Sequence, residues 1–361
     1  MKKYLFLTLM IFAFLTISKS SANAQSVKIG GYMQTWFILN QETQAPSYLG
    51  IDDGTSGIRI RRARLSAKAD LDEVFSVNIM LELADGSRNL YDFSLSAKVA
   101  PELVFTLGQF IVPCQMYETG KLSSAKIPLY ELSDIALTLS RNMGYDSYRD
   151  VGLMVNGNIS NMFKYYAYYG NGTGKLSFAG SNILNRKLTD GLYGLRLEVE
   201  PTKGVSIGGQ YSINNQDSIY VRDPVSNANN IIYRDRNSLS FDVATEKFGL
   251  PFLSTMISYG MGQVKDGNYP LNYNGLSATL MFDITKRIQL TGRFDTYNQK
   301  YDTDGAEESK YNNIIFGVNW FYYKGNEDIF RVGINYHIKN ESLERDKVDN
   351  NMFLVWTQLK F

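Results

Sequence analysis

Apolar and polar residues alternate along most of this chain with a period of two. In the last nine positions, Phe353, Val355, Thr357, Leu359 and Phe361 share one parity. Residues of one parity project from one face of a β-strand, so this stretch predicts a strand with an apolar face. After the N-terminal region, no stretch approaches the roughly 18 consecutive apolar residues that indicate a spanning helix. Segments of about ten alternating residues are typical of transmembrane β-strands.

The alternation repeats in sixteen segments, whose ends the pattern defines to within a few residues. They are residues 27–40, 58–71, 75–83, 90–99, 103–110, 150–159, 163–170, 191–200, 205–213, 237–246, 251–262, 273–283, 288–298, 312–322, 329–338 and 350–361. In the third segment Phe75, Val77 and Ile79 fall on one face, while Ser76 and Asn78 fall on the other. A soluble antiparallel sheet would alternate in the same way, so the period alone leaves both arrangements open.

The connections between segments fall into two classes that succeed each other along the chain. Short ones follow the second, fourth, sixth and eighth segments, and longer ones lie on the other side at residues 41–57, 111–149, 171–190 and 214–236. Outer-membrane barrels have short periplasmic turns and longer external loops. Because an unpaired strand edge is costly in hydrocarbon, such a sheet has to close. We therefore expect an all-β fold, a transmembrane antiparallel barrel of about 16 strands around an aqueous lumen.

The N-terminus has the pattern of a secretory signal peptide. Lys2 and Lys3 precede an apolar run at residues 4–17, and Ala22 and Ala24 supply small residues at a cleavage site. We expect residues 1–24 to be removed and residues 25–361 to form one domain in the bacterial outer membrane, in contact with its lipids. The terminal aromatic, Phe361, resembles the end of outer-membrane barrels that the barrel-assembly machinery recognises.

Composition removes several classes of function. The chain without residues 1–24 carries 34 Lys and Arg against 36 Asp and Glu, which gives no electrostatic reason to expect nucleic acid. Cys114 and His337 are the only residues of their types, so Ser-His-Asp, His-rich and Cys-based zinc sites each lack parts. Residues 302–308 contain part of a calcium-loop pattern without its remaining ligands, which favours a hydrated loop. We expect no cofactor, no metal and no enzymatic activity.

The most distinctive group of charged residues lies in the second segment. By parity Arg62, Arg64 and Lys68 face the lumen and form a row of cations along the pore. Guanidinium groups bind oxyanions through paired hydrogen bonds, and rows of Arg and Lys favour anions in a pore. A second interpretation stays open: these cations pair with acids on neighbouring strands, such as Glu82 and Asp92, and stiffen the wall.

Four short motifs suggest a relationship. They are Arg61-Arg62-Ala63-Arg64-Leu65, Gly108-Gln109-Phe110 followed by Pro113, Arg149-Asp150-Val151-Gly152, and Tyr169-Gly170-Asn171-Gly172. With them the chain resembles the phosphate-selective porin O and P family over essentially all of residues 25–361. The resemblance implies a sixteen-stranded, homotrimeric outer-membrane channel that passes small anions.

In that family the long connection after the fifth strand folds into the lumen and narrows it. The corresponding residues 111–149 carry many apolar side chains, which suit a loop packed against the barrel wall better than an external loop. Lys121, Lys126 and Arg141 are then candidates to face the constriction. The alternative is a surface flap that contributes to trimer contacts.

Inward charges decide the selectivity of such a pore. Further inward cations by parity are Lys98, Arg196, Arg293 and Arg331, but inward acids nearly balance the inward cations. We expect a porin for passive diffusion of small hydrophilic solutes that favours anions such as phosphate. A general, weakly selective porin and a non-conducting barrel that binds or scaffolds at the surface stay open as alternatives.

Overall fold

The chain is almost entirely sheet in the computed structural model. The structure describes residues 26–40, 56–84, 90–120, 126–145, 148–160, 162–174, 190–222, 229–265, 270–303, 308–324, 327–343, 346–348 and 351–361. The predicted signal peptide and Lys121 lie outside these ranges. None of the helices in the described ranges is long and apolar enough to cross a membrane.

The strands and the two short helices follow one another in a simple order. They are β1 (Ser26–Asn40), β2 (Gly57–Asp70), β3 (Phe75–Glu82), β4 (Leu90–Ala100), β5 (Leu103–Ile111), α2 (Tyr117–Gly120), α3 (Asp134–Met143), β6 (Arg149–Asn158), β7 (Phe163–Gly170), β8 (Gly191–Thr202), β9 (Val205–Arg222), β10 (Asn229–Glu246), β11 (Leu253–Val264), β12 (Leu271–Asp283), β13 (Ile288–Tyr301), β14 (Ser309–Lys324), β15 (Glu327–Leu343), β16 (Asp346–Val348) and β17 (Met352–Lys360).

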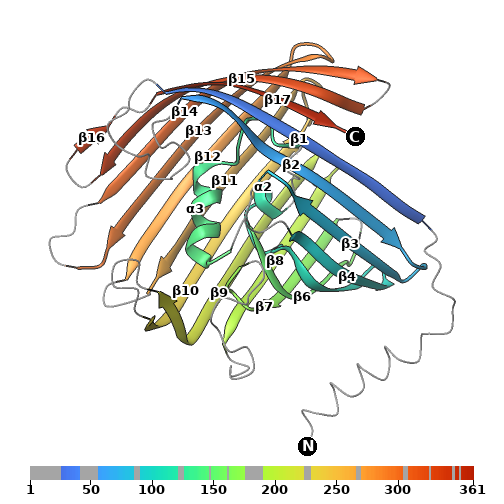
Figure 1. Cartoon of the computed structure of the whole chain (residues 1–361), viewed down its shortest axis with the longest axis vertical. Helices are drawn as coiled ribbons and strands as arrows, with labels where there is room; N and C mark the ends of the chain where they lie inside the picture. The colour runs from blue at the N-terminus through green and yellow to red at the C-terminus, as the bar shows by residue number, and fades with distance from the viewer. Residues whose placement is uncertain are drawn as a thin grey trace, which may run out of the picture.

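These strands form one closed antiparallel barrel, as predicted (Figure 1). Through β15 each strand pairs with the next along the chain, and β1 closes the ring by pairing with β17. The short β16 and β17 pair with β15 one after the other, so together they fill one place in a barrel of 16 strands. Phe361 completes the closure, because its N–H donates to the Gly31 carbonyl at 3.1 Å and its carbonyl accepts from the Gly31 N–H at 3.0 Å.

The period of two separates the two faces of the barrel wall. On β14 the side chains of Ile314, Phe316 and Val318 are exposed on the outside, whereas Asn313 and Asn319 are fully buried on the inside. The same division runs around the described strands, and exposed large apolar residues cover the outer face. The face assignment made from the sequence is therefore confirmed.

Part of the inner face is apolar as well. Trp36 of β1, Ile315 of β14 and Trp356 of β17 are buried in one cluster with Leu129 and Tyr130, which follow α2 in the chain. These inward positions can be apolar because a loop, rather than water, covers them. In β17 apolar residues therefore occupy both parities, because Met352, Leu354 and Trp356 are buried on the inner face.

The short connections predicted after the second, fourth, sixth and eighth segments are confirmed, because at most four residues separate β2 from β3, β4 from β5, β6 from β7 and β8 from β9. In the first of them the Asp72 carboxylate accepts hydrogen bonds from the N–H groups of Val74 and Phe75, at 2.8 and 2.6 Å, which tightens the turn. The prediction that residues 214–236 form one long connection is wrong. β9 and β10 continue to pair as far as Arg222 and Asn229. Backbone hydrogen bonds extend this hairpin beyond the end of the apolar alternation, which marks only the lipid-facing part of a strand.

Candidate functional site

The chain between β5 and β6 packs against the inner wall of the barrel. We call its described residues, 112–120 and 126–145, the lumen segment. The segment contains α2 and α3, and Figure 1 shows both helices within the curve of the strands. α3 contacts β10, β11, β12 and β13, and α2 contacts β10.

Helix α3 is held at both ends. Its first N–H groups point at carboxylates: the Ser133 N–H donates to Glu118 at 2.8 Å, and the Asp134 N–H lies 3.4 Å from an oxygen of Asp295. Negative charge is favourable at this end of a helix dipole. At the other end Gly144 adopts a left-handed conformation with φ 87°, and its N–H bonds back to the carbonyl of Arg141. The segment is therefore structured by contacts with the wall as well as by its own sequence.

Two glycines of the wall make room for this helix. A Cβ placed on Gly260 of β11 would lie 2.2 Å from a methyl carbon of Leu139, and one on Gly275 of β12 would lie 2.9 Å from a methyl carbon of Ile135. Both distances are well below van der Waals contact, so any larger residue would displace the helix or its side chains. The inner wall is thus shaped to receive α3.

A β-bulge in β2 brings two adjacent arginines to the lumen segment. Arg62 lies opposite Gln34 and Ile60 opposite Thr35, so Arg61 is the extra residue between them. Both guanidinium groups bind the carboxylate of Glu131, with Nη2 of Arg61 at 2.7 Å and Nη2 of Arg62 at 2.6 Å. Arg62 also donates to Gln34 at 2.6 Å. One buried carboxylate of the segment is therefore held by two cations of the wall.

The charges around Glu131 govern its protonation. Burial by itself favours the neutral acid, but the charges of Arg62 and Arg61 outweigh that effect and lower the pKa of Glu131 to about 2. Glu131 therefore stays ionised at neutral pH. Its ion pairs do not titrate in the physiological range.

Arginines and aromatic rings alternate across this part of the wall. The guanidinium carbons of Arg59 and Arg61 lie 5.3 and 5.0 Å from the centre of the Trp36 ring, and that of Arg64 lies 4.6 Å from the Tyr91 ring. Such stacking holds guanidinium groups in place. Because the bulge reverses the parity, Arg59 and Arg61 share the inner face with Arg62 and Arg64.

Sequence reasoning missed Arg59 and Arg61, although a signal was present. Ile58 and Ile60 alternate with Arg59 and Arg61, whereas the following apolar residues alternate with Arg62 and Arg64. This change of phase between two adjacent arginines places the bulge. Ile58 and Ile60 are indeed strongly exposed on the outer face.

The interpretation that inward cations pair with acids describes Arg64 well. Its Nε lies 2.8 Å from the Glu82 carboxylate on β3, and its Nη1 donates to the Tyr32 hydroxyl at 2.6 Å. In the same region Arg149 of β6 pairs with Asp92 of β4 at 2.6 Å. These neutral pairs stiffen the wall, as the second interpretation expected.

The remaining predicted cations lie in several environments. Arg196 forms two hydrogen bonds of 2.7 Å with Asp242 and donates to the Gln115 carbonyl of the lumen segment at 3.1 Å. Arg293 binds Asp295 at 2.8 Å and the Glu131 carbonyl at 2.9 Å. Arg331 lies over the Trp356 ring. The wall cations nearest the segment thus serve partly to hold it.

The other predicted cations in the described ranges are exposed. They are Lys68, Lys98, Lys126 and Arg141, and Lys68 lies 3.6 Å from Asp70.

Two of the short motifs also fix loops rather than a ligand. The carboxylate of Asp150 accepts hydrogen bonds from the N–H groups of Gly172 and Gly174, at 2.6 and 3.1 Å. Asn214 of β9 then bridges the Gly172 carbonyl, at 2.8 Å, and the carbonyl of Met143 at the end of α3, at 2.7 Å. The motifs around Asp150 and Gly172 therefore connect an external loop to the lumen segment.

No protein-family model matches this chain, and neither does any curated protein. Solved structures share its architecture. OmpT, an outer membrane protein of Vibrio cholerae in a trimer form, superposes with a TM-score of 0.64 at 12% identity, covering 94% of this chain and 100% of that one. For an anion-selective porin from Comamonas acidovorans the TM-score is 0.62 at 14% identity, with 93% and 99% covered. Salmonella typhi OmpF in complex with daunomycin gives 0.60 at 10%, with 93% and 97% covered.

The fold is that of bacterial outer-membrane porin barrels. Within this fold, charged side chains of the described residues gather on two parts of the wall. The arginine cluster, which we define as Arg59, Arg61, Arg62, Arg64 and Arg149, includes ion pairs with Glu82, Asp92 and Glu131. The wall from β7 to β10 carries four cations, Lys164, Arg196, Arg234 and Arg236, beside four acids, Glu198, Glu200, Asp242 and Glu246. On this part of the wall the named acids and cations are therefore equal in number.

Proposed function

We propose that this chain is an outer-membrane porin through which small hydrophilic solutes diffuse, with a preference for anions such as phosphate. The observation that carries the preference is the arginine cluster, in which two side chains face the lumen with part of their surface accessible. Arg59 is exposed, and the side chain of Arg61 is 29% exposed. Guanidinium groups suit phosphate-like oxyanions because they offer paired donors. An anion-selective porin among the structural neighbours supports this direction.

A general, weakly selective porin is the second candidate. The acids on β8 and β10 favour it, because they oppose the field of the arginine cluster. No catalytic role is proposed.

Changing the two accessible arginines separates these candidates. Removing a unit charge about 7 Å from a permeating ion in water changes its energy by about 0.6 kcal/mol, or about threefold in relative permeability. We therefore expect Arg59→Ala with Arg61→Ala to lower the chloride-to-potassium permeability ratio by about threefold or more. Arg62→Ala with Arg64→Ala should lower the same ratio less, because those side chains are only 3% and 8% exposed.

Reversal potentials in planar bilayers under a salt gradient measure this ratio. The matched control is Lys286→Ala with Arg287→Ala, which removes the same charge from an exposed turn between β12 and β13. Equal permeability of chloride and potassium in the unchanged protein would contradict the anion preference. A folded barrel that gives no channel currents would contradict the porin function and favour the surface-binding alternative.

The outer surface supports assembly into a trimer. Exposed Tyr and Trp side chains mark the level of lipid head groups, and in the described residues they occur from β7 to β14: Tyr169, Tyr193, Tyr211, Tyr259, Tyr301, Trp320 and Tyr322. The outer face of β2 instead carries small residues, including Ala63 and Ala67. We propose that the face formed by β1 to β6 meets two further copies of the chain.

A large residue on this face should prevent the assembly. We expect Ala67→Trp to abolish a trimer band on mildly denaturing gels, because an indole at a close-packed interface cannot be accommodated. The matched control, Ala278→Trp on the outer face of β12, should keep the trimer because its side chain would meet lipid. A chain that migrates as a monomer without any substitution, or a trimer that survives Ala67→Trp, would contradict the proposed interface.

A further inference from the structure

Three carboxyl groups meet where α3 touches the wall. Asp134 begins the helix, Asp295 projects from β13, and Glu118 comes from α2. An oxygen of Asp295 lies 3.4 Å from the Asp134 N–H and 2.8 Å from Nε of Arg293. Asn313 donates to the Asp134 carboxylate at 3.0 Å. All these side chains are buried, so bulk solvent screens their charges only weakly.

The cluster has more acids than cations. Arg293 is the guanidinium group that faces Glu118, Asp134 and Asp295. Two ionised carboxylates side by side in a dry site repel each other, so such a pair binds a proton. Burial first, and then the charge of Asp295, raises the pKa of Asp134 to about 7. Burial likewise raises the pKa of Glu118.

We propose that a proton held between Asp134 of the lumen segment and Asp295 of β13 fastens the segment to the barrel wall, so that the segment's attachment weakens as the pH rises. A proton on one of the two carboxyl groups removes their mutual repulsion, whereas two ionised groups repel each other. This makes the lumen segment a pH-responsive element, whether or not the barrel conducts.

The sign of the effect follows from which state binds the proton more tightly. When the segment leaves the wall, Asp134 regains an ordinary pKa of about 3.9. The attached state therefore holds more protons between about pH 4 and about pH 7. The proton's stabilisation of the attached state is fully present below that window. It decreases as the pH rises through the window, and above the window it changes no further.

Other titratable groups around the cluster act differently. Tyr311 of β14 forms a side-chain hydrogen bond with Asp134. Burial raises the pKa of Tyr130 of the segment, so Tyr130 stays neutral across this window. Glu131, held by Arg61 and Arg62, has its pKa lowered to about 2. The stabilisation of the segment by its ion pairs is therefore lost only below the window. His337 of β15 contacts the Tyr130 ring, with centroids 4.7 Å apart. Because His337 is present in every variant below, comparison between variants isolates the carboxyl pair.

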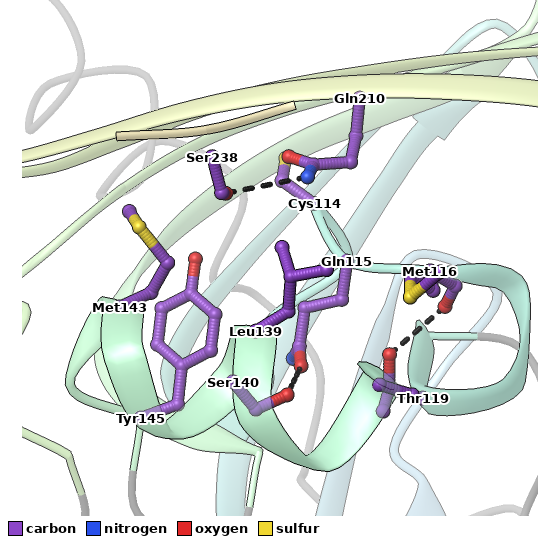
Figure 2. A pocket seen from close by; sticks show the side chains of 11 residues that line it. Cys114, Gln115, Met116, Thr119, Leu139, Ser140, Met143, Tyr145, Gln210 and Ser238 are labelled. Atoms are coloured by element: carbon purple, nitrogen blue, oxygen red, sulfur yellow. Dashed lines mark hydrogen bonds between the residues drawn. The ribbon is translucent and has the colours of Figure 1, made fainter. Parts of the chain in front are cut away.

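The chain carries its own reporter for release of the segment. Cys114, the single cysteine, is 1% exposed and lies between α3 and the wall, where Leu139 and Met143 line the same small cavity (Figure 2). Burial also raises the pKa of its thiol, which suppresses reaction in the attached state. A thiol reagent can therefore label Cys114 only when α3 moves away.

The test measures the labelling rate of Cys114 in refolded protein from about pH 4.5 to about pH 7.5, each rate divided by that of the urea-unfolded protein at the same pH. We expect this ratio to rise by at least about tenfold in the unchanged chain, since one pKa unit corresponds to a tenfold change. Asp134→Asn, which keeps the shape and imitates the neutral acid, should change by less than about twofold. Asp295→Asn should behave in the same way from the wall side.

Asp70→Asn, near the end of β2 and partly exposed, is the control for loss of a carboxylate elsewhere. Heat-modifiable gel migration identifies variants that fold. The proposal would be overturned if the labelling ratio of the unchanged chain stayed constant with pH. It would also be overturned if the ratio of Asp134→Asn rose with pH as much as that of the unchanged chain, or if Cys114 reacted in neither folded protein. Since labelling needs no channel activity, these outcomes are separate from failure of the porin function.

Discussion

Replacing Glu131 by Gln is expected to loosen the lumen segment and raise both the conductance and the anion preference of the pore. Glu131 is fully buried and binds Arg61 and Arg62 at once. Removing one partner of a buried ion pair leaves an uncompensated charge, which costs roughly 3–5 kcal/mol. The two arginines can regain hydration only if the segment moves away and admits water. The wider lumen would then expose two guanidinium groups to permeating ions.

Single-channel recording and reversal potentials test this expectation together. The conductance of Glu131→Gln should exceed that of the unchanged chain, and chloride should gain on potassium by about threefold, the effect of one unit charge about 7 Å away in water. Glu73→Gln, in the exposed turn between β2 and β3, removes the same charge and should change neither quantity. A Glu131→Gln pore with unchanged conductance and selectivity would mean that the segment is held without this ion pair.

A large side chain in place of Gly260, which belongs to the wall, is expected to displace α3. A Cβ at this position would lie 2.2 Å from a carbon of Leu139, which is buried in one cluster with Met116, Ile135 and Tyr273. A phenyl ring therefore cannot enter without moving the helix. Overpacking of this kind typically costs about 1–3 kcal/mol. Gly260→Phe should lower the unfolding temperature and increase labelling of Cys114 at every pH.

Gly292 supplies the matched control. It lies two strands away on β13, and a Cβ placed there would lie 4.0 Å from its nearest neighbour, the Ile315 carbonyl oxygen. Gly292→Phe adds the same ring to a strand without a close contact, so any general effect of glycine replacement appears in both variants. Thermal unfolding and Cys114 labelling that are equal in the two variants would contradict the close packing of α3 on Gly260.

The fold was predictable because lipid imposes a simple rule on a strand. Apolar side chains must face hydrocarbon at every second position, so residues such as Ile314, Phe316 and Val318 mark the strand directly in the sequence. Strand ends were less predictable where this rule stops. β9 and β10 extend past their apolar alternation to Arg222 and Asn229, because backbone pairing continues in water without any demand on the outer side chains.

The site was predictable only in part. Parity correctly placed Arg62 and Arg64 on the inner face, and the phase change at Arg61 was readable but was not used. The partners of these arginines could not be read from the sequence. Glu131 lies 69 residues from Arg62 along the chain, and no local period connects a loop carboxylate with a strand.

The sequence by itself determined the barrel, its strand order and the division of each strand into two faces, since these depend on near neighbours and on the solvent outside. The tertiary structure alone decided what the inward charges do. Paired with Glu131, Arg62 holds a loop, whereas Arg59 and Arg61 keep accessible surface and are the better candidates for guiding anions. The same contacts brought Asp134 beside Asp295. Charge–charge energies depend on distance in space and on burial, and folding sets both.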